Sequence, residues 1–108
     1  MKVLLDSSTP VQARQAFANQ EVFTVAQMGW GALEDVELLR QAESEKFDLL
    51  VLCEKNFQQL EAPGTRHLAI LELWTNHRPT FEHLFPLIRL TADMIRPGEY
   101  RALAAPEA

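Results

Sequence analysis

The sequence predicts an α/β domain with a mostly parallel central sheet flanked by helices. Short apolar runs alternate with segments whose apolar residues recur at helical spacing, and this order is typical of βαβ units. One run, residues 47–53 (FDLLVLC), is apolar at almost every position, as expected of a central parallel strand that is covered on both faces. Crossovers between such strands are right-handed, so the helices should cover the sheet.

The N-terminal part is expected to hold a strand, a helix and a second strand. Residues 3–5 (VLL) form the first strand, which ends at Asp6. Residues 7–10 (SSTP) combine N-cap types with a proline that suits a first helical turn, so a helix should follow. Its apolar face runs to about Asn19, and the β-formers at residues 22–25 (VFTV) predict the second strand.

The middle of the chain continues the alternation. After a break at residues 29–31 (GWG), a helix opens at Asp35. Four apolar residues are expected to form its buried stripe: Val36, Leu38, Leu39 and Ala42. Residues 47–53 form the third strand, and a turn at residues 63–64 (PG) separates it from a fourth strand at residues 67–74.

The C-terminal part predicts one long helix and an edge strand. The helix spans residues 80–95, and Pro86 should kink or restart it. Its apolar side comprises Phe81, Leu84, Phe85, Ile88, Ala92 and Ile95. Residues 97–98 (PG) end the helix, and residues 100–103 add the edge strand.

The composition fits one small domain in a reducing compartment. Of the 108 residues, 47% are apolar, so we expect a single domain over residues 1–103 and a loose tail at residues 104–108. Cys53 is the only cysteine, which excludes an intrachain disulfide. No apolar run is long enough for a signal peptide or a membrane span, so we expect a cytoplasmic protein without membrane contact. The net charge of −5 excludes a protein that coats nucleic acid by bulk attraction.

Acidic and polar residues gather where the predicted strands end. Asp6 follows the first strand, Glu54 follows the third, and Thr75 and Asn76 follow the fourth. The carboxyl ends of parallel strands share one edge of a sheet, so these side chains should face one crevice. Clustered oxygens suit Mg²⁺, which can activate a water and stabilise the charge on a phosphate that is being cleaved.

Other charged residues near this edge have two interpretations. Asp35 and Glu37 lie in the first turn of a helix, where acids favour the helix dipole without any ligand. In the second interpretation, this helix starts beside the crevice, and either carboxylate adds to the acidic residues at the strand ends. Lys55 and Arg78 follow predicted strands and are candidates to hold a nucleic-acid backbone.

Four stretches of the chain resemble a family of small bacterial PIN-like proteins. They are residues 1–6 (MKVLLD), 22–42 (VFTVAQMGWGALEDVELLRQA), 47–57 (FDLLVLCEKNF) and 95–100 (IRPGEY). Members are generally predicted to be nucleases of toxin–antitoxin systems. The resemblance implies a three-layer PIN-like fold, Mg²⁺ or Mn²⁺ as cofactor, RNA as substrate and an antitoxin protein as partner. We also expect a homo-oligomer.

The resemblance assigns roles to particular positions. Asp6 would be the first-strand acid, Glu37 the helix acid, and Glu54 would stand where the family usually has an aspartate. The residues implied in catalysis and metal binding are therefore Asp6, Glu37 and Glu54. Those implied in substrate binding are Lys55, Asn56, Thr75, Asn76 and Arg78, and Gln58 and Gln59 resemble the polar residues that follow.

Two departures from the family pattern keep three functions open. Ser7 stands where many members have a glutamate, and Glu54 carries one methylene more than the usual aspartate. The longer side chain matters because a shift of about 1 Å in a catalytic group can cost ~10²-fold in rate. The chain is therefore an active or weakened metal-dependent endoribonuclease, or an inactive PIN-like module that binds protein. A receiver-like signalling domain is the third reading, although Glu54 is not a phosphoacceptor.

Overall fold

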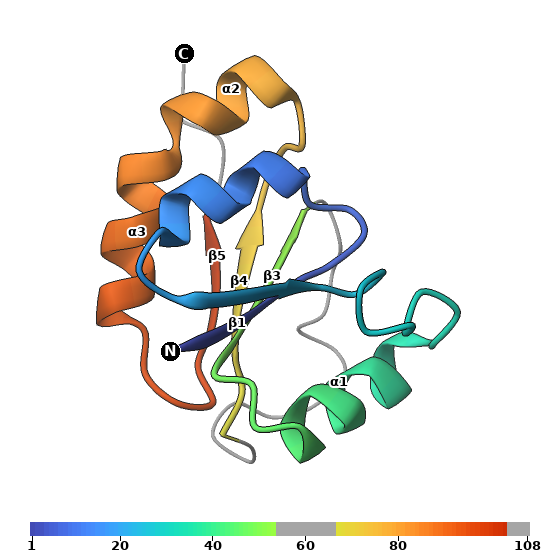
Figure 1. Ribbon diagram of the computed structural model, residues 1–108. Coiled ribbons are helices and arrows are strands. Elements are labelled where there is room, and N and C mark those ends of the chain that lie inside the picture. Colours follow the sequence, from blue (N-terminus) through green and yellow to red (C-terminus); the bar gives the residue numbers. More distant parts are fainter. Residues whose placement is uncertain (54–66, 104–108) are drawn as a thin grey trace.

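A computed structural model describes residues 1–53 and 67–103, which form a five-stranded sheet between helices (Figure 1). The strands are β1 (Lys2–Leu5), β2 (Glu21–Thr24), β3 (Leu49–Cys53), β4 (Ala69–Leu73) and β5 (Tyr100–Leu103). The helices are the 3-10 helix η1 (Val11–Phe17) and the α-helices α1 (Asp35–Ser44), α2 (Arg78–His83) and α3 (Phe85–Met94). Every strand pairing is parallel, in the order β2-β1-β3-β4-β5. The predicted α/β class with a parallel sheet between helical layers is confirmed.

The chain reverses its direction of travel across the sheet between β1 and β3. It moves outward from β1 to β2, and then returns past β1 to β3, β4 and β5. In doubly wound sheets of this order, ligands bind beyond the carboxyl ends of the strands at this switch point. The register pairs Leu5 with Val51, so the chain leaves β1 at Asp6 beside the end of β3.

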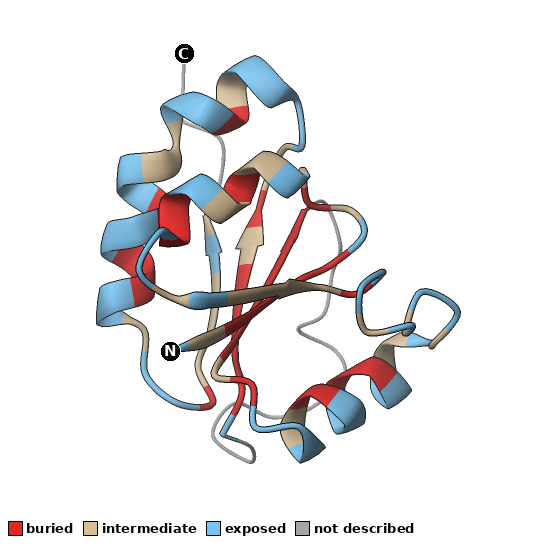
Figure 2. Ribbon diagram, viewed as in Figure 1, coloured by how far each residue is buried: buried red, intermediate tan, exposed pale blue. Residues whose placement is uncertain are grey.

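One face of the sheet is covered by η1, α2 and α3 (Figure 1). Alternate strand residues point to this side, among them the fully buried Val3, Val51 and Leu71. Phe17 of η1 and Phe81 of α2 complete the core from the helical side. Figure 2 shows the buried residues of these helices turned toward the strands. Each large side chain buried in this way stabilises the fold by roughly 1.5–3 kcal/mol.

The opposite face is covered by α1 and carries a second core. Leu4, Leu50 and Ile70 of the strands contribute to it without any exposed surface. The helix contributes Leu38, Leu39 and Ala42. The fully buried ring of Phe47 lies edge-on to Phe23, with the ring centroids 5.8 Å apart, and makes a similar contact with Trp30 at 5.9 Å.

A left-handed residue joins α1 to β3. The Phe47 N–H donates to the Ala42 carbonyl at 3.0 Å, and the Lys46 N–H donates to the Glu43 carbonyl at 3.1 Å. This is a Schellman motif, in which the residue after the C-cap adopts a positive φ. Lys46 holds that place with φ of 64°. The motif turns the chain sharply enough to send Phe47 back into the second core.

The predicted strands are confirmed, with ends that differ by one or two residues. β2 begins at Glu21 and ends before Val25. β3 begins two residues later than the predicted range 47–53, and β4 begins two residues later and ends one residue earlier than the predicted range 67–74. The edge strand at residues 100–103 is confirmed as predicted. Strand ends shift because backbone pairing depends on the neighbouring strand, which a single stretch of sequence does not contain.

The helices differ more from the prediction. The helix after Pro10 is a 3-10 helix, and the single helix expected over residues 80–95 is divided at Leu84, because Pro86 suits the first turn of a new helix and has no N–H to continue the old one. The prediction that Val36 is buried is wrong: it is 45% exposed, since the stripe that packs on the sheet passes to its other side. Within residues 1–53 and 67–103, none of the helices is long and apolar enough to span a membrane.

Candidate functional site at the carboxyl ends of the strands

Asp6 is the most buried acidic side chain that the structure describes, with 2% of its surface exposed. Its N–H donates to the Val51 carbonyl at 2.9 Å, which extends the β1–β3 pairing by one bond beyond the strand. Its carbonyl accepts from the Thr9 N–H at 2.9 Å and so closes a tight turn. Asp6 therefore lies at the switch point, as the sequence predicts.

Ser8 holds the Asp6 carboxylate. Both the backbone N–H and the hydroxyl of Ser8 donate to Asp6 Oδ2, at 3.1 and 2.6 Å. The same hydroxyl oxygen accepts from the Cys53 N–H at 3.0 Å. A buried carboxylate is costly unless hydrogen bonds compensate for its lost hydration, and Ser8 provides two of them. Ser8 thus connects the loop after β1 to the last residue of β3.

Two further side chains tie the loops of this end together. The Thr9 hydroxyl donates to the Val51 carbonyl at 2.9 Å, and the Cys53 thiol contacts the Thr9 hydroxyl at 3.7 Å. The Asn76 amide donates to the Ser8 carbonyl at 3.3 Å. The loop after β1, the last residue of β3 and the loop after β4 therefore meet around Ser8. Cys53 is buried, as free cysteines commonly are.

The expected substrate-binding residues after β4 lie on this connection to α2. Asn76 reaches the loop after β1, whereas the Thr75 hydroxyl accepts from the His77 N–H at 3.0 Å. Arg78 is exposed and is the first residue of α2. An exposed guanidinium beside these loops is suitably placed to meet a phosphate.

Glu37 lies on the exposed side of α1. It accepts from the Arg40 guanidinium at 3.1 Å, and its side chain keeps 54% of its surface exposed. No described contact joins it to Asp6 or Ser8, so its part in a common site stays a prediction. Glu54, Lys55 and Asn56, with Gln58 and Gln59, lie outside the described residues.

The oxygen donors described at this end fit a divalent ion in part. Asp6 offers one carboxylate, and Mg²⁺ usually takes one or two carboxylates and keeps several waters. Among residues 1–53 and 67–103, no group of three His, Cys, Asp or Glu side chains is arranged to hold a metal ion. Glu54 follows Cys53 directly in the chain, so a pair formed by Asp6 and Glu54 stays the predicted metal site.

Two cavities lie at the opposite, amino end of the sheet. One is lined by residues of η1 and α3, and the other is lined in part by His67 and Asp48, whose side chains are hydrogen-bonded to each other. Burial raises the pKa of Asp48, but the hydrogen bonds from the His67 ring and the Lys2 N–H, with the nearby positive charges, outweigh it and bring the pKa below its usual value. The sequence does not predict this pair, because its two residues are 19 positions apart.

Ser8 and Thr9 are the residues at this site whose roles the sequence did not predict. Both were expected only as N-cap types, whereas their hydroxyls bond to Asp6 and Val51 and η1 has no side-chain cap. An aspartate that ends an apolar strand and is followed two and three residues later by hydroxyl side chains is the signal that could have indicated this turn.

Comparisons with known proteins identify no relative of the chain: no family model, no curated protein and no solved structure matches it.

Proposed function

We propose that this chain is a metal-dependent endoribonuclease whose crevice lies beyond the carboxyl ends of β1 and β3. The observation that carries the proposal is the buried carboxylate of Asp6, held by Ser8 at the switch point of the sheet. A fold that needed only a turn here could use a neutral residue and avoid the cost of burying a charge. An acid retained at this place favours chemistry that uses a carboxylate.

The described residues have separate tasks in this proposal. Ser8 fixes one oxygen of the Asp6 carboxylate with two hydrogen bonds. Asp6 and Glu54 would hold Mg²⁺ or Mn²⁺, which supplies an activated water and stabilises charge on the phosphate when it is bound. Arg78 would contact the RNA backbone together with Lys55, and the Asn76 amide connects the loop after β4 to the loop after β1. With a net charge of −5, the protein would contact few phosphates.

The biological setting follows from the same proposal. A small ribonuclease of the toxin class acts in the cytoplasm on cellular RNA and is inhibited by an antitoxin protein. A second copy of the chain is the other proposed partner, and sedimentation velocity at two protein concentrations tests for it.

Cleavage of a fluorescent single-stranded RNA tests the activity. Asp6→Asn keeps the size of the side chain and removes the charge, so it should abolish Mn²⁺-dependent cleavage. Glu21→Gln removes an exposed acid from β2, changes the net charge by the same amount and should leave cleavage unchanged. Thermal melts of both variants separate loss of the fold from loss of the site. Equal cleavage by the wild type and Asp6→Asn, or cleavage that persists in EDTA, contradicts the proposal.

An inactive binding module is the second candidate. It is favoured by Glu37, which is exposed and paired with Arg40, and by the departures at Ser7 and Glu54. If the nuclease is only weakened, Glu54→Asp, alone or with Ser7→Glu, should raise Mn²⁺-dependent cleavage above that of the wild type. If the double variant folds, binds metal and cleaves no RNA, the binding module becomes the better account.

A further inference from the structure

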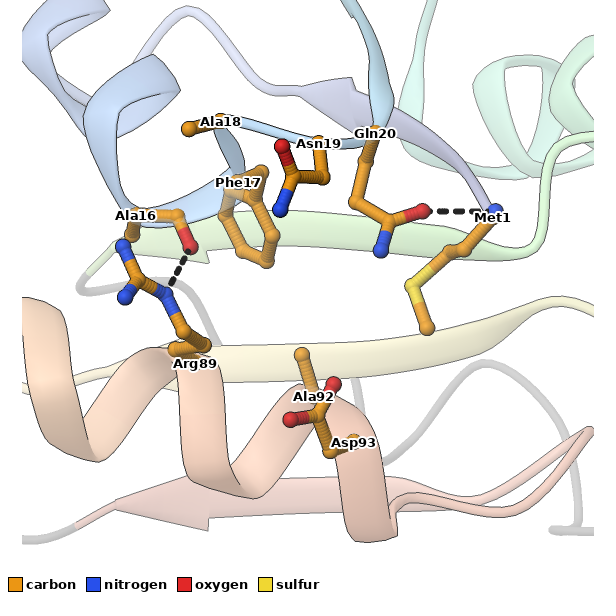
Figure 3. A pocket seen from close by; sticks show the side chains of 9 residues that line it. All are labelled: Met1, Ala16, Phe17, Ala18, Asn19, Gln20, Arg89, Ala92 and Asp93. Carbon is orange, nitrogen blue, oxygen red and sulfur yellow. Dashed lines mark hydrogen bonds between the residues drawn. The ribbon is translucent and has the colours of Figure 1, made fainter.

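A cavity of about 210 Å³ opens at the amino end of the sheet, on the side away from Asp6 (Figure 3). It lies between the end of η1, the connection to β2 and the last turns of α3. The lining residues are Met1, Ala16, Phe17, Ala18, Asn19, Gln20, Arg89, Ala92 and Asp93. Pockets for drug-sized ligands enclose roughly 300–1,000 Å³, so this one suits a smaller molecule.

The cavity has an apolar floor. Phe17 and Ala92 are 3% exposed and belong to the core beneath η1 and α3, and Ala16 lies beside them. These side chains offer a small molecule a short apolar surface. They leave room at the rim for polar groups, which come from the connection on one side and from α3 on the other.

The positive group at the rim is fixed in place. Arg89 Nε donates to the Ala16 carbonyl at 3.1 Å, and one terminal nitrogen donates to the Gln15 carbonyl at 3.2 Å. These bonds hold the guanidinium against the end of η1, as Figure 3 shows for Ala16. They turn its terminal nitrogens away from Asn19, Gln20 and Asp93, so Arg89 forms one end wall of the cavity (Figure 3).

The negative group at the rim, Asp93, forms no ion pair with any residue that the structure describes. Asp93 lies four residues after Arg89 on α3, a spacing at which opposite charges commonly pair. Because Arg89 is directed to η1, no ion pair joins the two in the described part of the chain, and no hydrogen bond of the Asp93 carboxylate to a described residue is found. The Asp93 carboxylate at the mouth of the cavity therefore lacks the ion-pair partner that its own helix offers.

Amide groups complete the rim opposite α3. Gln20 Oε1 accepts from the Met1 nitrogen at 2.7 Å, which turns the amide nitrogen of Gln20 toward α3 (Figure 3). Asn19 lies beside it on the same connection. In Figure 3 the amide nitrogens of Asn19 and Gln20 both point toward α3, so a ligand carboxylate would meet two amide donors, whereas a ligand ammonium would meet Asp93.

We propose that this cavity binds a small zwitterion of the α-amino-acid class with a short apolar side chain. The ammonium group binds the Asp93 carboxylate, and the carboxylate binds the amide N–H groups of Asn19 and Gln20. The side chain lies over Phe17 and Ala92. The site is separate from the crevice at Asp6, so this inference stands or falls independently of the nuclease proposal.

Amide chemical shifts in titrations with three matched probes test the site. L-valine carries both charges, isobutylamine lacks the carboxylate, and isobutyrate lacks the ammonium group. The shifts of Asn19, Gln20 and Asp93 should saturate with valine at a concentration ~10-fold lower than with either other probe, because each lost charge-assisted bond weakens binding by that order. Unsaturable shifts with valine, or equal affinity for isobutylamine, would overturn the proposal.

Substitution of the carboxylate gives the second arm. Asp93→Asn should weaken valine binding ~10-fold and leave the weak binding of isobutyrate unchanged, since only the ammonium contact is lost. Glu82→Gln removes an exposed acid from α2, outside the cavity, and should leave both affinities unchanged. The dispersion of the amide spectrum reports whether each variant is folded. Valine binding that is the same in Asp93→Asn and the wild type would overturn the assignment.

Discussion

Replacement of Ser8 by alanine is the most direct test of how the loop after β1 is held to the end of β3. The substitution removes the hydroxyl that donates to Asp6 Oδ2 at 2.6 Å and that accepts from the Cys53 N–H at 3.0 Å. A hydrogen bond to a charged group contributes ~1.5–3 kcal/mol, and a buried N–H that loses its acceptor costs ~1–3 kcal/mol. The Ser8 N–H still donates to Asp6 in the variant, and Ser8 is half-buried, so the two losses do not add in full.

We therefore expect Ser8→Ala to lower the free energy of unfolding by about 2–4 kcal/mol, a large share of the ~5–15 kcal/mol typical of a domain. Urea denaturation should show a midpoint lower by roughly 1–2 M with an unchanged slope. Ser7→Ala alters the exposed neighbouring serine and should stay within ~0.5 kcal/mol of the wild type. If Ser8→Ala behaves like Ser7→Ala, the proposed role of the Ser8 hydroxyl is refuted.

Three other substitutions test the fold away from this site. Phe47→Ala should cost ~3–5 kcal/mol in urea denaturation, because the ring is fully buried between Phe23 and Trp30, and a loss below 1 kcal/mol would contradict that packing. Lys46→Gly should stabilise the protein by ~0.5–1 kcal/mol, since glycine adopts the positive φ of 64° without strain, and a lower midpoint would refute it. The folded pKa of Asp48 lies below its usual value of 3.8, so this group contributes stability above that pH and loses the contribution as the pH falls through the lowered pKa. The difference in urea midpoint between pH 5 and pH 3 should therefore be smaller in Asp48→Asn than in the wild type, and an equal difference would exclude the pair with His67.

The sequence predicted the strands well because their burial is visible in the residues themselves. Leu49 to Cys53 is apolar at each position and is buried at each position. The break in the long C-terminal helix was also signalled by Pro86, although α2 ends at His83, three residues before the proline. Local chemistry was sufficient in both cases.

Contacts between distant residues could not be predicted in the same way. Ser8 meets Cys53 only because β1 and β3 pair with a particular register, and that register is a property of the assembled sheet. The side of α1 on which Glu37 lies could not be predicted either, because an acidic residue in a first helical turn has the same sequence pattern whether it faces a crevice or pairs with Arg40. The cavity beside Asp93 depends on how η1 packs against α3, for which no stretch of sequence gives a pattern.

Paramagnetic broadening by Mn²⁺ in amide spectra tests the central claim most directly, because it locates a bound ion without requiring activity. The account predicts that substoichiometric Mn²⁺ broadens the resonances of Ser8, Thr9 and Cys53 and leaves those of Asn19 and Asp93 sharp. Asp6→Asn should abolish the broadening, whereas Glu21→Gln should not. Broadening centred on α1 or on the amino end of the sheet, or the same broadening in Asp6→Asn, would contradict a metal site at the switch point.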